Sequence, residues 1–178
     1  MGHADQLIMR SAEGKIGGIM KGCPFCADNS DIAISESEDF LAIYNQAPIV
    51  RGHSLVIPRK HFEFLMQMDN AAVSDFFLFA REATSKILSA YNATDYDWIL
   101  QEGSSAGQTV PHVHLHIIPR REGDLESPGS WFERLTGTRV AVDSASRMKL
   151  NRTDMRRETV FIKGNRTPRK IFRDGYAQ

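Results

Sequence analysis

Three histidines alternate with apolar residues in the heptapeptide HVHLHII, which covers residues 112–118. The alternation has a period of two, and its β-branched residues favour an extended strand, expected here over residues 111–119. On such a strand the three imidazoles share one face, and the apolar residues between them enter a core. The histidines are His112, His114 and His116, and the apolar residues are Val113, Leu115 and Ile117.

The spacing of these histidines argues against a single metal ion bound by all three. Neighbouring imidazoles on a strand lie roughly 6.8 Å apart and the outer pair roughly 13.6 Å apart, whereas zinc–nitrogen bonds are only about 2 Å long. The row therefore favours catalysis, with one nucleophile and neighbours that polarise or protonate a substrate. The alternative is a solvent-facing strand with chance histidines, which is disfavoured because three of the six histidines fall within five residues.

The bulk composition describes an ordinary globular protein. With 178 residues, 42% hydrophobic and 25% charged, we expect one domain, or one domain with an appendage. No run of 18 apolar residues is present, so no membrane span is expected. The first 22 residues lack the apolar segment and cleavage site of a secretory signal, so a cytoplasmic location is the expectation.

Charge is distributed unevenly along the chain, although the formal net charge is zero. Residues 1–118 hold 8 Lys+Arg against 14 Asp+Glu, and residues 119–178 hold 14 against 8. The basic tail either contacts phosphates or an acidic partner, or is a solvated extension that complements the acidic body. No block reaches five like charges, so nucleic-acid binding is not favoured.

The only two cysteines form a CxxC, Cys23-Pro24-Phe25-Cys26. In a cytosolic chain this spacing suggests zinc or redox chemistry rather than a structural disulfide. A thioredoxin-like role requires a following helix in a βαβ pattern, but residues 27–31 read as a turn. Half of a zinc site is therefore the favoured interpretation, and two buried free thiols are the alternative.

The remaining pattern predicts an α+β fold. Strands are expected at residues 40–45, 53–58 and 97–102, and one long helix starts at a cap on Asp69 or Asn70 and ends after Tyr91. This order favours an antiparallel sheet with the helix on one face. Beyond Pro119 the sequence suggests a short helix over residues 128–135 and a late strand over residues 159–163.

The chain carries GQT at residues 107–109, GH at residues 52–53 and Asn45 in addition to the triad segment. In these features it resembles the histidine triad (HIT) superfamily, most closely its fragile-histidine-triad branch. That branch comprises dinucleoside polyphosphate hydrolases. The resemblance covers residues 23–121 and implies a HIT-like antiparallel sheet of about five strands with one long helix. Residues 1–22 would then be an N-terminal extension, and residues 122–178 a basic C-terminal extension packed on or swapped over this domain.

The resemblance also implies roles for the histidines. His114 would be the nucleophile that attacks the α-phosphorus and forms a nucleotidyl-histidine intermediate. The main-chain carbonyl of His112 would fix its tautomer. His116 would approach the bridging oxygen of the leaving nucleotide, and His53 would support the triad. The simpler alternative is that His53 is a core histidine whose hydrogen bonds are satisfied.

Substrate-binding roles follow in the same way. Gln108 and the backbone around Thr109 would face the phosphate oxygens, Asn45 would bind ribose hydroxyls, and Gln101 would line the phosphate path. Two of these residues have simpler explanations in the sequence itself. Gln108 can serve only to stabilise its loop, and Asn45 can be a turn former before Ala47-Pro48.

Some bacterial members of the superfamily bind structural zinc, and the matching positions here are Cys23, Cys26, His61 and His112. Two thiolates and two imidazoles make a closed tetrahedral set. Human-type fragile-histidine-triad enzymes lack this CxxC, so the chain combines features of two branches. Mg²⁺ accompanying the substrate polyphosphate is a further expectation from the resemblance.

Other activities stay open at this point. The same fold supports phosphorylases, which pass the nucleotidyl group to phosphate, and nucleoside phosphoramidases, which are shorter after the triad. A non-catalytic nucleotide-binding module is an alternative of another class. A cupin-like metal enzyme is disfavoured because the first acid after His114, Glu122, lies beyond Pro119. By resemblance the partner is a small nucleotide substrate, and the chain is a homodimer.

Overall fold

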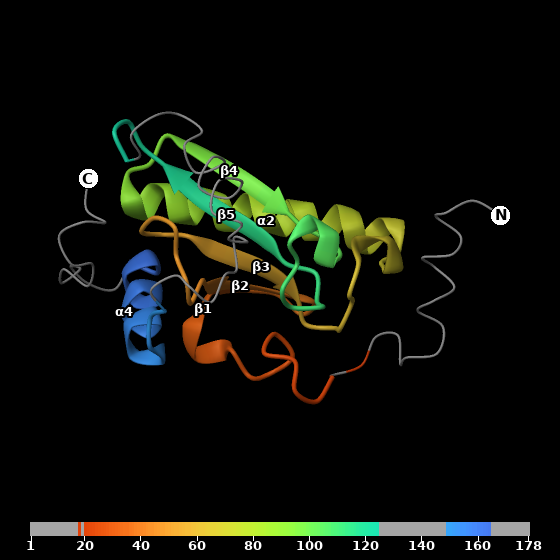
Figure 1. Cartoon of the computed structure of the whole chain (residues 1–178). Coiled ribbons are helices and arrows are strands. Elements are labelled where there is room, and N and C mark those ends of the chain that lie inside the picture. The colour runs from red at the N-terminus through yellow and green to blue at the C-terminus, as the bar shows by residue number, and fades with distance from the viewer. Residues whose placement is uncertain (1–17, 19, 125–148, 165–178) are drawn as a thin grey trace.

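The computed structural model describes residues 18, 20–124 and 149–164, and its centre is a five-stranded antiparallel sheet. The strands follow the order β1-β2-β3-β5-β4 across the sheet (Figure 1). They are β1 Ala33–Glu36, β2 Phe40–Tyr44, β3 Ser54–Pro58, β4 Asp95–Leu100 and β5 Leu115–Arg120. The predicted α+β class with an antiparallel sheet of about five strands is confirmed.

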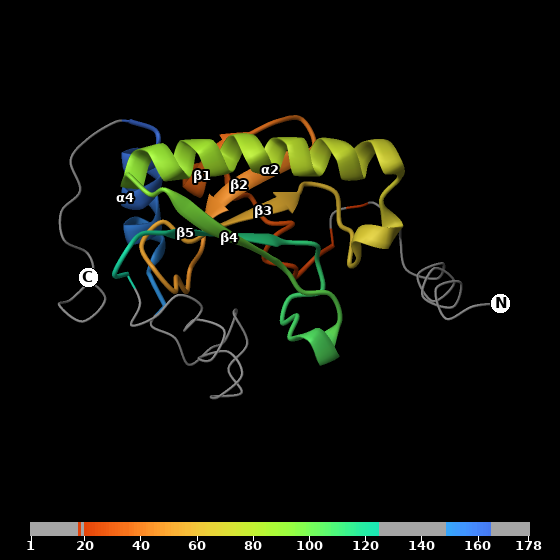
Figure 2. The same cartoon turned by 90° about the horizontal axis from the view of Figure 1, so that it is seen from above.

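The long helix α2, Asn70–Tyr91, lies along one face of this sheet (Figure 2). The Asp69 side chain caps its first turn by accepting a hydrogen bond from the Ala72 N–H at 2.8 Å. At its other end Asn92 adopts the left-handed conformation with φ 49°, which closes the helix. The buried stripe of the helix packs on the sheet and consists of Phe76, Phe79, Ala80, Ala83, Thr84, Ile87 and Tyr91.

The central strands carry most of the core. Every residue of β2 and β3 is buried, and only the last residue of β5 is partly exposed. Because β2 and β3 are buried on both faces, their sequences are nearly continuous apolar segments and do not alternate. The ends of β2, β3 and β5 therefore provide rigid positions for the polar residues that follow or precede them.

The histidine strand is shorter than the sequence predicts. β5 begins at Leu115, so His112 and His114 precede it and only His116 lies within it. The backbone leaves the sheet because the Val113 N–H donates to the carbonyl of Phe62 at 2.6 Å, a residue of the loop after β3. The prediction of burial was correct for the apolar positions, since Val113, Leu115 and Ile117 are at most 2% exposed.

Two further elements differ from the expectations. The sequence reading missed strand β1, which pairs with β2. Residues 159–163 were expected to form a strand but belong to helix α4, Arg152–Ile162. Asn151 caps this helix by accepting from the Asp154 N–H at 2.9 Å. Its buried residues have helical spacing, which overrides the β-propensity of its end; they are Met155, Glu158, Thr159 and Ile162.

Helix α4 packs against the rest of the described chain and contacts α2, β1, β2 and the 3₁₀ turn η1, Ser30–Ile32. Two further 3₁₀ turns are η2, Leu65–Gln67, and η3, Ser104–Ala106. The short helix expected over residues 128–135 falls outside the described residues. Within the described ranges no helix has the length and hydropathy to cross a lipid bilayer.

Candidate active site

The predicted catalytic histidines come together where the central strands end. His53 directly precedes β3, His116 lies in β5, and His112 and His114 lead into β5. β3 and β5 are paired neighbours, which places residues 54 and 117 opposite each other. All four histidines are at most 1% exposed, so they form one buried cluster.

The proton on His114 is fixed by the backbone. Its Nδ1 lies 2.7 Å from the main-chain carbonyl oxygen of His112. Because a carbonyl oxygen only accepts, Nδ1 carries the hydrogen, and Nε2 of the neutral ring keeps its lone pair. This is the tautomer that a nucleophilic imidazole requires.

His53 and His116 form a directional pair. The Ile49 N–H donates to His53 Nδ1 at 3.1 Å, so the proton of neutral His53 is on Nε2. That Nε2 lies 2.9 Å from His116 Nδ1, which must then accept. Neutral His116 therefore carries its proton on Nε2 and is a hydrogen-bond donor there. The Asn45 amide nitrogen lies 3.1 Å from His53 Nε2 at the end of β2.

The two predicted phosphate-binding glutamines contact the backbone of their own loop. Gln108 Oε1 accepts from the Gly103 N–H at 2.7 Å, and its Nε2 donates to the Glu63 carbonyl at 3.1 Å. Gln101 Nε2 donates to the Ala106 carbonyl at 2.5 Å. These contacts hold the loop before the triad in shape; a contact of either residue with phosphate stays a prediction.

A cavity of about 520 Å³ lies next to the cluster. Apolar side chains form much of its wall, and Asn45 and Thr109 also line it. The C-terminal segment contributes Lys149 and Met155 to the same wall. Sequence reasoning missed these last two residues because nothing in their local pattern links them to the triad. The apolar residues include Phe25, Ile32, Ile43 and Leu55.

The residues that line the cavity do not include His114, which is buried and only 1% exposed. Phe25, which lines the cavity, is one of the groups that cover it, with ring centroids 5.2 Å apart. A ligand that approaches His114 must therefore displace such a group.

A carboxylate without a predicted role lies near the nucleophile. Burial raises the pKa of Glu102, although the Leu65 N–H donates to it and the charge interaction with His114 opposes the rise. Its position directly after Gln101 is a sequence signal that could have included it in the site. An anionic Glu102 favours a positive charge on His114.

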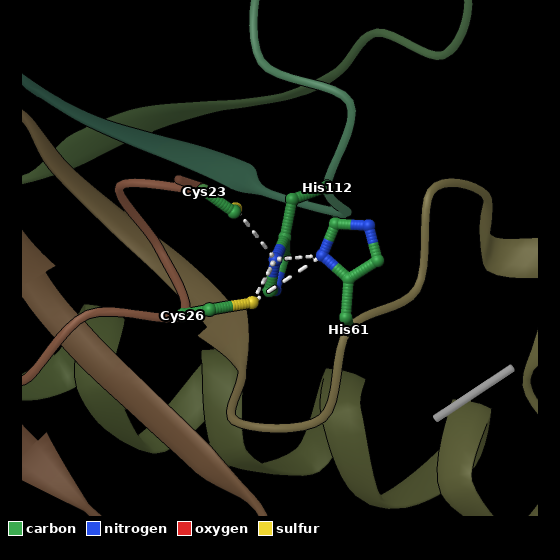
Figure 3. Close-up of side chains that lie close together, drawn as sticks. All are labelled: Cys23, Cys26, His61 and His112. Atoms are coloured by element: carbon green, nitrogen blue, oxygen red, sulfur yellow. Dashed lines mark hydrogen bonds between the residues drawn. The ribbon is translucent and has the colours of Figure 1, made fainter. Parts of the chain in front are cut away.

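The four predicted metal ligands also meet (Figure 3). The donor atoms of Cys23, Cys26, His61 and His112 all lie within 4.8 Å of one another. His112 Nδ1 lies 3.4 Å and 3.6 Å from the two sulfurs, and 3.1 Å from His61 Nδ1. A tetrahedral site with bonds of about 2.0–2.3 Å has edges of roughly 3.3–3.8 Å. The residues therefore fit a structural metal ion such as zinc.

The protonation of His112 suits a ligand. Its Nε2 donates to the Pro58 carbonyl at 2.9 Å, which leaves the Nδ1 lone pair directed at the cluster. Burial lowers the pKa of His112 to about 4, so the ring is neutral near pH 7. His112 thus joins the two centres, since its ring belongs to the cysteine cluster and its carbonyl holds His114.

Comparison with known proteins decides the family. The family described as HIT domain matches residues 27–123, more than half of the chain. The chain belongs to the HIT family. This confirms the resemblance drawn from the triad and its flanking motifs.

Two curated relatives of this HIT protein match the same region. One is the Arabidopsis thaliana protein named bifunctional bis(5'-adenosyl)-triphosphatase/adenylylsulfatase FHIT, 37% identical over 53% of this chain and 52% of its own length. The other is the Schizosaccharomyces pombe bis(5'-nucleosyl)-tetraphosphatase [asymmetrical], 40% identical over 47% of this chain and 46% of its own. The chain thus spans about half the length of these relatives.

A solved structure of the same family is also similar to this chain. The structure described as a Zn-bound histidine triad family protein from Mycobacterium smegmatis is 27% identical, with a TM-score of 0.56. The match covers 81% of this chain and 92% of that protein.

Proposed function

We propose that this HIT protein is a nucleotidyl hydrolase that cleaves dinucleoside polyphosphates at the α-phosphorus through a covalent intermediate on His114. The observation that carries the proposal is the pair of fixed tautomers. An unprotonated Nε2 on His114 and an Nε2–H on His116 supply a nucleophile and a hydrogen-bond donor two residues apart. The names of the curated relatives, a triphosphatase and a tetraphosphatase, support this substrate class.

In the first step His114 Nε2 attacks the α-phosphorus, and the bond from phosphorus to the bridging oxygen breaks. The His116 Nε2–H donates a hydrogen bond to that oxygen, which stabilises the charge of the second nucleotide as it leaves as an anion. The nucleotidyl imidazole keeps its Nδ1–H, so it is cationic. The His112 carbonyl at 2.7 Å and the nearby Glu102 stabilise that charge.

In the second step water attacks phosphorus, and the phosphorus–nitrogen bond breaks. His114 leaves as the neutral ring with its proton on Nδ1, and the water proton is released to solvent. The products are a nucleoside monophosphate and the remaining nucleotide.

The cavity suits one half of the substrate. Its apolar wall, with Ile43 and Leu55, fits a flat base. Asn45 lies between that wall and His53, which supports the predicted contact with ribose hydroxyls. Thr109 lies at the cavity as well, so the α-phosphate enters between it and the histidines once Phe25 is displaced.

The test is product analysis with diadenosine tetraphosphate in ¹⁸O-labelled water, with and without inorganic phosphate. Hydrolysis at the α-phosphorus gives ATP and ¹⁸O-labelled AMP regardless of phosphate. A phosphorylase gives ADP and ATP in phosphate only, and a phosphoramidase leaves this substrate intact while cleaving an adenosine phosphoramidate. Binding of AMP without turnover of any of these substrates would favour a non-catalytic module.

We also propose that Cys23, Cys26, His61 and His112 hold a structural zinc ion. The donor separations and the neutral His112 ring support it, as does the zinc-bound relative. When bound, the metal would hold the loop of residues 23–26, and with it Phe25, against the triad.

Metal analysis of the purified protein should give one zinc per chain, and a Cys23→Ser/Cys26→Ser variant should contain none. Removal should lower the unfolding midpoint by more than about 5 °C, since a structural ion contributes several kcal/mol and each kcal/mol shifts the midpoint by about 2–4 °C for a chain of this size. Full stability without metal would refute the zinc site.

We further propose a homodimer that pairs through the outer surface of α2 and the edge strand β4. Leu78 on α2 and Tyr96 on β4 support it, because they are 47% and 46% exposed although large and apolar. β4 also has one neighbour in the described sheet, so its other edge is available for pairing.

A further inference from the structure

A buried carboxylate in α4 has no part in the chemistry above. Glu158 is 1% exposed and lies outside residues 27–123, the region that matches the HIT domain. Its two oxygens each accept a hydrogen bond of 3.1 Å from Arg51, one from Nε and one from Nη2. The Tyr91 hydroxyl donates to the same carboxylate at 2.5 Å. A buried charge needs such partners, because an unpaired one is costly.

The contacts continue from Glu158 into the sheet. The ring of Tyr91, whose hydroxyl bonds Glu158, lies against Gly52. The Gly52 N–H donates to the hydroxyl of Tyr44 in β2 at 3.0 Å. The carboxylate thus holds Arg51 directly, and its partner Tyr91 packs on Gly52.

The residues that make these contacts directly precede Asn45 and His53, two residues of the site, in the chain. Tyr44 is the last residue of β2 and precedes Asn45, while Arg51 and Gly52 precede His53. Gly52 has a φ of +93°, and a Cβ there would lie 2.7 Å from Tyr91 Cδ2. The turn at Gly52 therefore packs closely against the ring of Tyr91, the residue that bonds Glu158.

We propose that Glu158 is a positioning residue that sets the geometry of the His53–His116 pair through the turn of residues 51–53. The inference rests on the proposed function, in which the His116 Nε2–H donates a hydrogen bond to the leaving group. The 2.9 Å contact from His53 Nε2 orients that imidazole, and His53 takes its position from the clamped turn. Helix α4 then contributes to the geometry of the site, although it lies outside the residues that match the HIT domain.

The test compares Glu158→Gln with Arg157→Gln, a control in the same helix whose side chain is 64% exposed and bonds only Asp154 among the described residues. Glu158→Gln keeps the side-chain volume but loses the charge that holds Arg51. We expect kcat for diadenosine tetraphosphate to fall roughly tenfold or more, because small displacements of catalytic groups are costly. KM should stay within about twofold, and Arg157→Gln should behave as wild type.

A second readout separates this inference from the proposed function. The ring nitrogen NMR signals of His53 and His116 should shift in Glu158→Gln and stay unchanged in Arg157→Gln, whether or not the protein cleaves a dinucleotide. If Glu158→Gln does not fold, Tyr91→Phe removes only the connecting hydroxyl, and the same signals should move. Unchanged imidazole signals in a folded variant of either kind would overturn the inference, as would an unchanged kcat in an active enzyme.

Discussion

Backbone groups place the protons on the imidazoles of the site, and this placement assigns different tasks to chemically identical side chains. The His112 carbonyl leaves His114 Nε2 unprotonated, while the Ile49 N–H acts through His53 to leave a proton on His116 Nε2. A neutral imidazole is an adequate nucleophile once its lone pair is oriented. The nucleophile therefore needs orientation more than activation.

Replacement of His116 tests its role as donor. His116→Ala should lower kcat by about 10²–10³-fold, the usual effect of removing one hydrogen-bond donor to developing negative charge. His116→Gln, which keeps an N–H in a similar place, should lose less. The loss should shrink when adenosine 5'-(4-nitrophenyl phosphate) replaces the dinucleotide, because nitrophenolate delocalises its own charge and needs less stabilisation. Equal losses with both substrates would show that His116 acts in another way.

Among the elements, those with a strong local period could be predicted and those built by long-range contacts could not. The stripe and caps of α2 and the runs of β2 and β3 are local signals, and all three elements were placed to within two residues. Residues 159–163 combine β-branched and aromatic side chains, so they read as a strand. Only the Asn151 cap and the packing of Met155 and Glu158 under the sheet edge make them helical.

The residues of the candidate site also divide into those that local motifs predict and those that only long-range contacts bring together. The CxxC and the triad are local motifs, so the sequence indicated their chemistry and, through the family resemblance, His61 and His53 as well. Lys149 and Met155 line the cavity although they lie more than 30 residues beyond His116 in the sequence. No spacing rule links them to it, because only the fold brings α4 against β2 and α2.

The contact between α4 and Asp31 should weaken at acid pH. The side-chain hydrogen bond from Arg152, with a further one from Arg156, holds the pKa of Asp31 well below its usual range. A lowered pKa means that the unfolded chain binds the proton more readily. The stabilisation is therefore complete above the ordinary carboxyl pKa of about 3.9 and is lost as the pH falls below it.

Thermal unfolding of Asp31→Asn tests this contact. At pH 7 its midpoint should lie about 2–4 °C below that of the wild type, because partly exposed ion pairs contribute about 1 kcal/mol or less. The gap should close as the pH is lowered from 5 towards 2. A constant gap across this range would show that Asp31 acts through packing and not through its charge.

At the scale of the whole molecule, strands and loops far apart in sequence build one site, and the proposed dimer involves the outer surface of α2 and the edge of β4. The chain mass is 20.0 kDa, so sedimentation should give about twice that value for the proposed dimer. Tyr96→Lys should produce monomers, because a lysine on a sheet edge opposes pairing. Val160→Lys, an exposed position on α4, is the matched control and should leave the dimer intact.

The central claim is that the imidazole of His114 bonds to phosphorus during turnover. The most direct measurement is mass spectrometry of the protein quenched in alkali during cleavage of diadenosine tetraphosphate, with peptide mapping of the adduct. The account predicts one adenylyl group on His114, absent from a folded His114→Asn variant that has lost turnover. Turnover that persists in His114→Asn, or an adduct on any other residue, would contradict it.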